Sequence, residues 1–289
     1  MFLWELDFLK FLEGFRTGFL NFLFELITTL GEDTVIVLLM SVIYFMYDKN
    51  LARKIFFVTV ISLGINGTLK NILRLPRPFA NGHITCVRPE TATGYSFPSG
   101  HTQCFATWGT AFAIELNRCW FKICIAILIV LTAFSRMYLG AHYPIDVIAG
   151  AALGVFCAFV FGTLYEKAAD KNKLFAIALS AFTPFAIFFL VKPDLMYSDF
   201  FKFYGMTIGL FTSTLFEEKF VGFGYDCSVF KKILRVVLAV AVAYLIKELI
   251  GIFTFSNLQL ALLFSVVAYF ILTFVTLALL PLLFKKIKM

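Results

Sequence analysis

Three cationic side chains lie where apolar segments of the chain end. Lys70 and Arg77 follow one apolar run, and Arg136 closes another. A charge at the edge of hydrocarbon is costly and usually serves a function. Cations that converge on one site would bind a multiply charged anion, and the planar fork of arginine suits phosphate. These residues therefore predict a phosphate-binding site.

A second polar stretch, Pro98-Ser99-Gly100, has the pattern of a helix start. Ser99 is a typical N-cap residue. The free N–H groups of a helix N-terminus bind phosphate, and Gly100 would let the anion approach the backbone closely. This stretch predicts a second set of phosphate ligands.

Two of the three histidines, His101 and His142, accompany these polar stretches. Pro144 suits the first turn of a helix, which places His142 just before that helix and Asp146 in its first turn. A carboxylate–imidazole hydrogen bond would fix the tautomer of the ring and stabilise the imidazolium. One oriented histidine can act as a nucleophile and another as a general acid. The chemistry predicted is phosphoryl transfer through a phosphohistidine, with no metal and no cofactor.

The composition requires a membrane around this site. Hydrophobic residues make up 61% of the 289 residues and charged residues 15%, with 38 Phe. The mean hydropathy is +0.89. Soluble domains have about 45–50% apolar and about 25% charged residues, so a water-soluble globule is excluded. The net charge of +7 is explained by cytoplasmic loops, and no nucleic-acid partner is expected. The six cysteines form no CxxC pair, so neither a disulfide framework nor a zinc site is predicted.

The apolar runs predict a polytopic all-α bundle surrounded by membrane lipids. Residues 1–16 have the apolar spacing of an amphipathic helix at the membrane interface. The clear candidate spans are 53–69, 100–116, 120–137, 146–164, 174–191, 233–252 and 258–284, and shorter ones lie at 17–30, 33–47 and 203–216.

One long polar loop, residues 70–98, interrupts this pattern, and loops of such length tend to be functional. The loops on the other face carry most of the lysines and arginines, namely Lys49, Arg53, Lys54, Arg118, Lys122, Lys167, Lys171, Lys173, Lys219, Lys231, Lys232, Lys285, Lys286 and Lys288. The positive-inside rule places those loops, and both termini, in the cytoplasm. The site is then expected on the extracytoplasmic face of the cell membrane.

Taken together, the motifs K-x6-RP, PSGH and SR-x5-H-x3-D resemble those of the type 2 phosphatidic acid phosphatase superfamily. This group includes lipid phosphate phosphatases and vanadium haloperoxidases. The resemblance implies that His142 is the nucleophile, Asp146 orients it and His101 protonates the leaving alkoxide. It implies that the phosphate is held by Lys70, Arg77, Ser99, Gly100 and Arg136. The signature also contains Pro78, Pro98 and Ser135.

The resemblance covers residues 17–165, which would form the six-helix phosphatase core of the family. Residues 174–289 add three or four helices to that core. Arg16-Thr17 and the later Gly205, Gly209 and Glu217 are similar to features of the larger bacterial members that are like sphingosine-phosphate phosphatases.

The function expected is metal-independent hydrolysis of a lipid phosphomonoester or pyrophosphate. Three alternatives stay open: a lipid phosphotransferase, a phosphatase for a soluble sugar phosphate, and a lipid transporter or binding protein with a vestigial site. For the single residues, the alternative is a structural polar group at the interface or a cation that reaches lipid headgroups. The sequence carries no signal for the oligomeric state.

Overall fold

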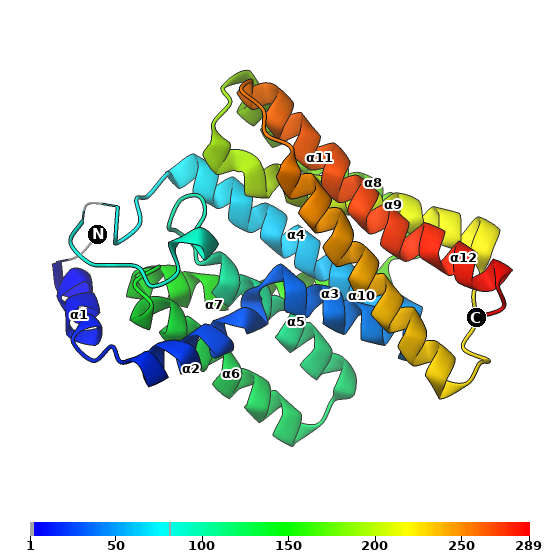
Figure 1. Ribbon diagram of the computed structural model, residues 1–289, viewed down its shortest axis with the longest axis horizontal. Helices are drawn as coiled ribbons and strands as arrows, with labels where there is room; N and C mark the ends of the chain where they lie inside the picture. Colours follow the sequence, from blue (N-terminus) through cyan, green and yellow to red (C-terminus); the bar gives the residue numbers. More distant parts are fainter. Residues whose placement is uncertain (1–2, 81) are drawn as a thin grey trace. The chain divides into compact units, whose positions relative to one another are not determined.

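The apolar runs fold as helices, because a backbone in hydrocarbon must satisfy its own hydrogen bonds. The computed structural model describes residues 3–80 and 82–289, and no strand occurs among them (Figure 1). The α-helices are α1 (Leu3–Glu13), α2 (Gly18–Thr28), α3 (Asp33–Val42), α4 (Lys49–Leu73), α5 (Gly100–Leu116), α6 (Cys119–Tyr138), α7 (Pro144–Lys167), α8 (Lys171–Val191), α9 (Ser198–Phe216), α10 (Val229–Ile252), α11 (Leu258–Phe274) and α12 (Leu280–Lys286). The prediction of an all-α membrane helix bundle is confirmed.

Five helices are long and apolar enough to cross a membrane: α4, α6, α7, α8 and the continuous run Leu258–Lys286 that contains α11 and α12. In the described part of the chain, α5, α9 and α10 form where predicted but do not meet the combined standard of length, hydropathy and low charge. The short spans predicted at 17–30 and 33–47 correspond to Gly18–Gly31 and Asp33–Tyr47, which meet at a bend of 55°. Each half is shorter than the roughly 20 residues of a span, so the two form at most one crossing.

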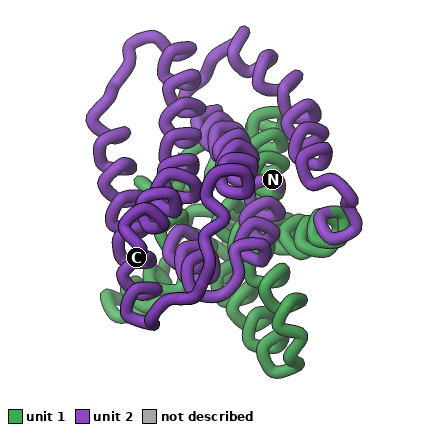
Figure 2. The backbone as a smooth tube through the Cα atoms, turned by 90° about the vertical axis from the view of Figure 1, so that its right-hand side faces the viewer, with its two compact units in different colours: residues 1–35, 62–164 green, residues 36–61, 165–289 purple. Residues whose placement is uncertain are grey.

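The chain divides into two compact units (Figure 2). Unit 1 contains the described residues up to 35 together with 62–164, and unit 2 contains 36–61 with 165–289. The chain passes between the units within α3, α4 and α7. The predicted division at 1–16, 17–165 and 174–289 concerns function rather than compactness, and it stays a prediction.

Close packing of α7 on α5 organises unit 1. Gly150 and Gly154 lie one turn apart on α7, and small residues at this spacing let helix backbones approach. A Cβ at Gly150 would lie 2.7 Å from the carbonyl oxygen of Ser99. A Cβ at Gly154 would lie 2.6 Å from the carbonyl oxygen of Gln103. The two glycines therefore hold the start of α5 against the start of α7.

Helix α1 packs against the long polar loop and the start of α7 within unit 1. Leu9 is fully buried beside Ile84 of that loop and Tyr143. Glu5 accepts a hydrogen bond from the backbone N–H of Ile145 (3.1 Å). The charge pattern of the loops predicts α1 and the long polar loop on opposite faces of the membrane, an arrangement that this contact does not support. The bent pair has the form of one broken span or of a re-entrant loop, rather than of the two separate spans predicted.

Unit 2 has its own small-residue contact and a buried ion cluster. A Cβ at Gly205 of α9 would lie 2.3 Å from the carbonyl oxygen of Val266 in α11, so these helices are in close contact. The Glu217 carboxylate, at the end of α9, is fully buried and lies 2.9 Å from Lys49 Nζ and 2.5 Å from Arg53 Nη2. Removing one partner of such a pair would leave a buried charge uncompensated, so the cluster ties α9 to the start of α4.

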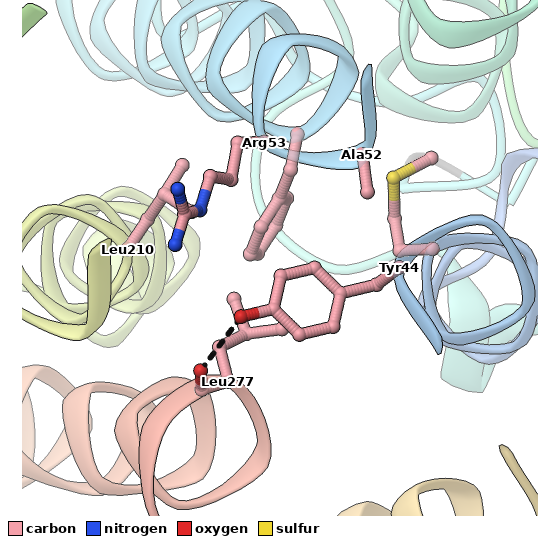
Figure 3. Close-up of a pocket in the computed structure, with 7 residues that line it drawn as sticks. Tyr44, Ala52, Arg53, Leu210 and Leu277 are labelled. Atoms are coloured by element: carbon pink, nitrogen blue, oxygen red, sulfur yellow. Dashed lines mark hydrogen bonds between the residues drawn. The ribbon is translucent and has the colours of Figure 1, made fainter. Parts of the chain in front are cut away.

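A small apolar pocket lies beside this cluster, within unit 2 (Figure 3). The hydroxyl of Tyr44, which lines the pocket, donates a hydrogen bond to the carbonyl oxygen of Leu277 (2.9 Å). The pocket is lined by Met40, Tyr44, Ala52, Arg53, Phe56, Leu210 and Leu277.

The α5–α7 contact predicts that Gly154→Ala destabilises the protein. The new methyl group would press on the Gln103 carbonyl and on Ala106, so we expect a loss of about 1–3 kcal/mol in unfolding free energy. Gly251→Ala in α10 is the matched control, because in the described chain a Cβ there meets no atom within 4 Å. That control should be neutral or slightly stabilising. Thermal unfolding in detergent measures both, and equal midpoints for the two variants would contradict the packing role.

Candidate active site

His142 lies in the turn between α6 and α7 and is almost completely buried. Its Nδ1 is 3.3 Å from Asp146 Oδ2, and its Nε2 is 3.1 Å from Arg77 Nη1. A guanidinium only donates, so Nε2 must accept and the ring hydrogen sits on Nδ1, facing the carboxylate. This tautomer gives Nε2 the lone pair that a nucleophile needs. The structure thus places His142 and Asp146 in the contact predicted from their spacing.

The Asp146 carboxylate is held by two further donors. Its Oδ2 accepts from Ser96 Oγ (2.5 Å) and from the backbone N–H of Tyr143 (2.9 Å). Ser96 is fully buried and lies 3.5 Å from His142 Nδ1. The sequence analysis did not assign Ser96 a role, although it lies in the polar stretch before Pro98. A serine within a few residues of a phosphate-binding motif was the signal that could have found it.

The cations Arg77 and Lys70 are anchored by carbonyl groups of the chain that surrounds them. Arg77 donates to the carbonyls of Gly94 (2.9 Å) and Ala141 (3.0 Å), and Lys70 donates to that of Tyr95 (2.7 Å). Both side chains are largely buried, with 6% exposure. The long polar loop therefore fixes two cations beside the imidazole of His142.

The start of α5 faces the same region. Ser99 is fully buried at the N-cap position, and its backbone N–H donates to the carbonyl of Asp146 (3.0 Å). Its hydroxyl lies 3.0 Å from that of Thr102. A Cβ at Gly100 would meet only an ordinary contact, 3.6 Å from Asn66 Oδ1, so packing within the protein does not require glycine there. The close approach of an anion to the backbone is a further reason for glycine at position 100.

Within unit 1, His101 and Arg136 have buried polar side-chain atoms without a hydrogen-bond partner in the described chain. Among the described residues, His101 Nε2 and the Nε and Nη2 of Arg136 have no hydrogen-bond partner. Arg136 is fully buried. Buried donors are nearly always paired in native proteins, so such atoms call for an explanation. A phosphate group has the acceptors that these donors lack.

The electrostatics of the site favour a neutral nucleophile. Burial, followed by the positive charges of Arg77, Lys70 and Arg136, lowers the pKa of His142 well below its usual 6.5. The imidazole is therefore uncharged at neutral pH when the site is unliganded. All eight predicted site residues belong to unit 1, where Arg77, His142 and Asp146 are in direct contact.

Two comparisons with protein families cover most of the chain. Residues 51–170 match the PAP2 superfamily, and residues 201–289 match the PAP2 superfamily phosphatase, transmembrane extension. The chain belongs to the PAP2 superfamily. The resemblance predicted from the three motifs is confirmed, and the transmembrane extension accounts for helices beyond the phosphatase core.

Relatives in this superfamily carry names of lipid phosphatases. The probable sphingosine-1-phosphate phosphatase of Dictyostelium discoideum is 28% identical over 170 residues, which is 54% of this chain and 40% of the relative. The undecaprenyl-diphosphatase of Sulfolobus acidocaldarius is 34% identical over 101 residues, 35% of this chain and 48% of the relative. The dihydrosphingosine 1-phosphate phosphatase YSR3 of Saccharomyces cerevisiae is 26% identical over 265 residues, 82% of this chain and 64% of the relative. The chain thus spans less than two thirds of the length of each. No solved structure matches the chain.

The buried setting of His142 predicts its titration. In the unliganded protein the ring should stay neutral at pH 6.5 and become protonated only at lower pH, because protonation adds a positive charge next to Arg77. Arg77→Gln should move the pKa upward. Imidazole ¹⁵N spectra of histidine-labelled protein measure this, with His142→Asn assigning one of only three ring systems. Protonation of His142 at or above pH 6.5 would contradict the electrostatic picture.

Proposed function

We propose that this protein is an integral membrane lipid phosphatase that hydrolyses a lipid phosphomonoester or diphosphate through a phosphohistidine. The observation that carries the proposal is the placement of His142 between Asp146 and Arg77, in which Nε2 is an acceptor whose lone pair could attack phosphorus once Arg77 turns to the phosphate. The names of the relatives support the lipid class, since they include phosphatases for sphingosine phosphates and for undecaprenyl diphosphate.

In the first step His142 Nε2 attacks phosphorus. The P–N bond forms while the bond from phosphorus to the lipid oxygen breaks, and the leaving oxygen takes a proton from His101. That role requires His101 as imidazolium, a form that a bound phosphate dianion favours. In the second step water attacks phosphorus, the P–N bond breaks and His101 accepts the proton of the water. Inorganic phosphate leaves, and His142 is again neutral.

Phosphate binding and charge stabilisation fall to the remaining polar groups. Arg77 would turn from His142 Nε2 to a phosphate oxygen, and Lys70 would stay close to its present position. Arg136 offers the two donors that the protein leaves unsatisfied. Ser99 and the backbone at Gly100 supply donors from the start of α5. Preorganised donors of this kind stabilise the charge that develops in the transition state.

We further propose that residues 17–165 act as the phosphatase core, with 1–16 as an interfacial helix and 174–289 as added transmembrane helices. The site would face outward from the cell membrane, because the loops of the other face carry most of the lysines and arginines. Since α1 packs against the long polar loop, the N-terminal helix lies on the site face.

The first test is His142→Ala. Without an imidazole no phosphoenzyme can form, so phosphate release should fall by at least about a thousandfold. His83→Ala is the matched control, because His83 is the third histidine and is exposed in the long polar loop. Phosphate release is measured in detergent with EDTA, on a sphingoid phosphate, phosphatidic acid, a polyprenyl diphosphate and glucose 6-phosphate.

Retention of more than a tenth of the activity by His142→Ala would exclude the phosphohistidine mechanism. Release from glucose 6-phosphate alone would favour a soluble substrate, and transfer to an added alcohol without phosphate release would favour a phosphotransferase. No turnover of any substrate would leave a binding or transport role. Activity restored only by magnesium would contradict the metal-independent reaction.

A second test concerns the faces of the membrane. Single cysteines at Lys10, His83 and Asn172, which are all exposed, are introduced into a chain without its native cysteines. In intact cells an impermeant maleimide should label positions 10 and 83 and spare position 172. The reverse pattern would move the reaction to the cytoplasmic leaflet. Labelling of only one of positions 10 and 83 would contradict the packing of α1 on the long polar loop.

A further inference from the structure

The bend that joins α2 to α3, residues 28–32, contacts three parts of the site. The side chain of Thr28 contacts Arg136, and Gly31 packs against the backbone of His101. Glu32 pairs with Arg88 of the long polar loop (2.8 Å). We propose that Thr28, at this bend, is a positioning residue that acts on the phosphate site through Arg136. This inference rests on the proposed function of the site and names a residue that the superfamily motifs do not contain.

The contact of Thr28 with Arg136 decides which edge of the guanidinium is left for a ligand. Arg136 Nη1 donates to Thr28 Oγ1 at 3.1 Å and to Thr91 Oγ1 at 3.4 Å. Arg136 Nε and Nη2 are buried and, within the described chain, have no partner. Those two nitrogens form one edge of the planar fork, the arrangement that binds two oxygens of a phosphate side by side. The hydrogen bonds of Nη1 therefore fix the orientation of the guanidinium, and with it the direction in which the Nε–Nη2 edge faces.

The bend is held firmly enough to act as such an anchor. A Cβ at Gly31 would lie 2.4 Å from the carbonyl oxygen of His101, so only glycine permits this approach to the first turn of α5. The indole N–H of Trp108, further along α5, donates to the carbonyl of Leu30 (3.2 Å). Thr28 and Arg136 are both fully buried, so water does not compete for their hydrogen bond. The bend thus joins the helix of the general acid to the phosphate-binding arginine.

The test is Thr28→Val, which keeps the shape of the side chain and removes the acceptor. Loss of a hydrogen bond to a charged group corresponds to roughly a 10- to 100-fold change in an equilibrium constant. We expect the Kd for orthovanadate, a phosphate mimic, to rise by that factor, and kcat/KM to fall by a similar one. Thr28→Ser should restore both. Thr29→Val is the matched control, since in the described chain the hydroxyl of Thr29, the residue after α2, hydrogen-bonds only to the carbonyl of Leu26 (2.7 Å).

A double-mutant cycle separates positioning from a structural effect. In an Arg136→Gln background the fork is gone, so Thr28→Val should weaken vanadate binding by less than about twofold. Undiminished losses in that background, or equal losses from Thr28→Val and Thr29→Val, would overturn the proposal. Should Thr28→Val not fold, Thr28→Cys substitutes a poor acceptor of similar size and must give the same loss.

Vanadate binding is measured on purified protein without turnover, which keeps this inference apart from the proposed function. Suppose that the wild-type protein binds vanadate, that Thr28→Val weakens this binding and that the wild-type protein hydrolyses no phosphate ester. This result would contradict the proposed function alone. Full hydrolysis together with wild-type vanadate binding by Thr28→Val would contradict the inference alone.

Discussion

The concentration of buried positive charge in unit 1 is the constraint on which the site depends. Arg136 is fully buried, Arg77 and Lys70 are nearly so, and like charges at close range repel more strongly away from water. Carbonyl groups near Arg77 and Lys70 offset part of this repulsion, whereas Arg136 has two hydroxyl partners. In the proposed function, the negative charge that balances these cations would come from a phosphate dianion. Burial, and after it the same cations, lower the pKa of His142, so the groups that would bind the substrate also help to keep the proposed nucleophile neutral.

Helix packing maintains that arrangement against its own repulsion. Gly150 and Gly154 let α7 approach the start of α5, and this approach brings the carbonyl of Asp146 to the N–H of Ser99. The carboxylate of Asp146 meanwhile faces His142. Asp146 of α7 therefore contacts both the proposed nucleophile, His142, and the start of α5, where the phosphate is proposed to bind. A shift of either helix would disturb both functions, because positioning within a fraction of an ångström governs such chemistry.

The sequence predicted those contacts of the site that join residues close to one another along the chain, because their chemistry and spacing together indicate which side chains meet. His142 and Asp146 stand one helical turn apart, so their contact follows from local structure. Ser96 and Thr28 were missed because their partners are distant along the chain: Thr28 meets Arg136 across 108 positions. Serine and threonine hydroxyl groups are common in helices and loops alike, and only the three-dimensional contact distinguishes these two. The helices themselves were largely predictable, because hydrocarbon permits few other backbone structures.

The bend at residue 32 shows why the sidedness of the N-terminal helix was harder to predict. Hydropathy detects two apolar runs on either side of it, and counting each as a crossing returns the chain to its starting face. A single crossing would put the lysine-rich loop at Lys49 and helix α1 on opposite faces, with α1 on the face of the long polar loop. Its charges permit this, because Glu5, Asp7 and Glu13 outnumber Lys10 and Arg16. The burial of Glu5 then has a structural explanation, since its carboxylate accepts a hydrogen bond from the backbone N–H of Ile145 at the start of α7. Ile145 lies only three residues after His142. The helix that the sequence predicts to be interfacial thus also supports the turn that carries His142.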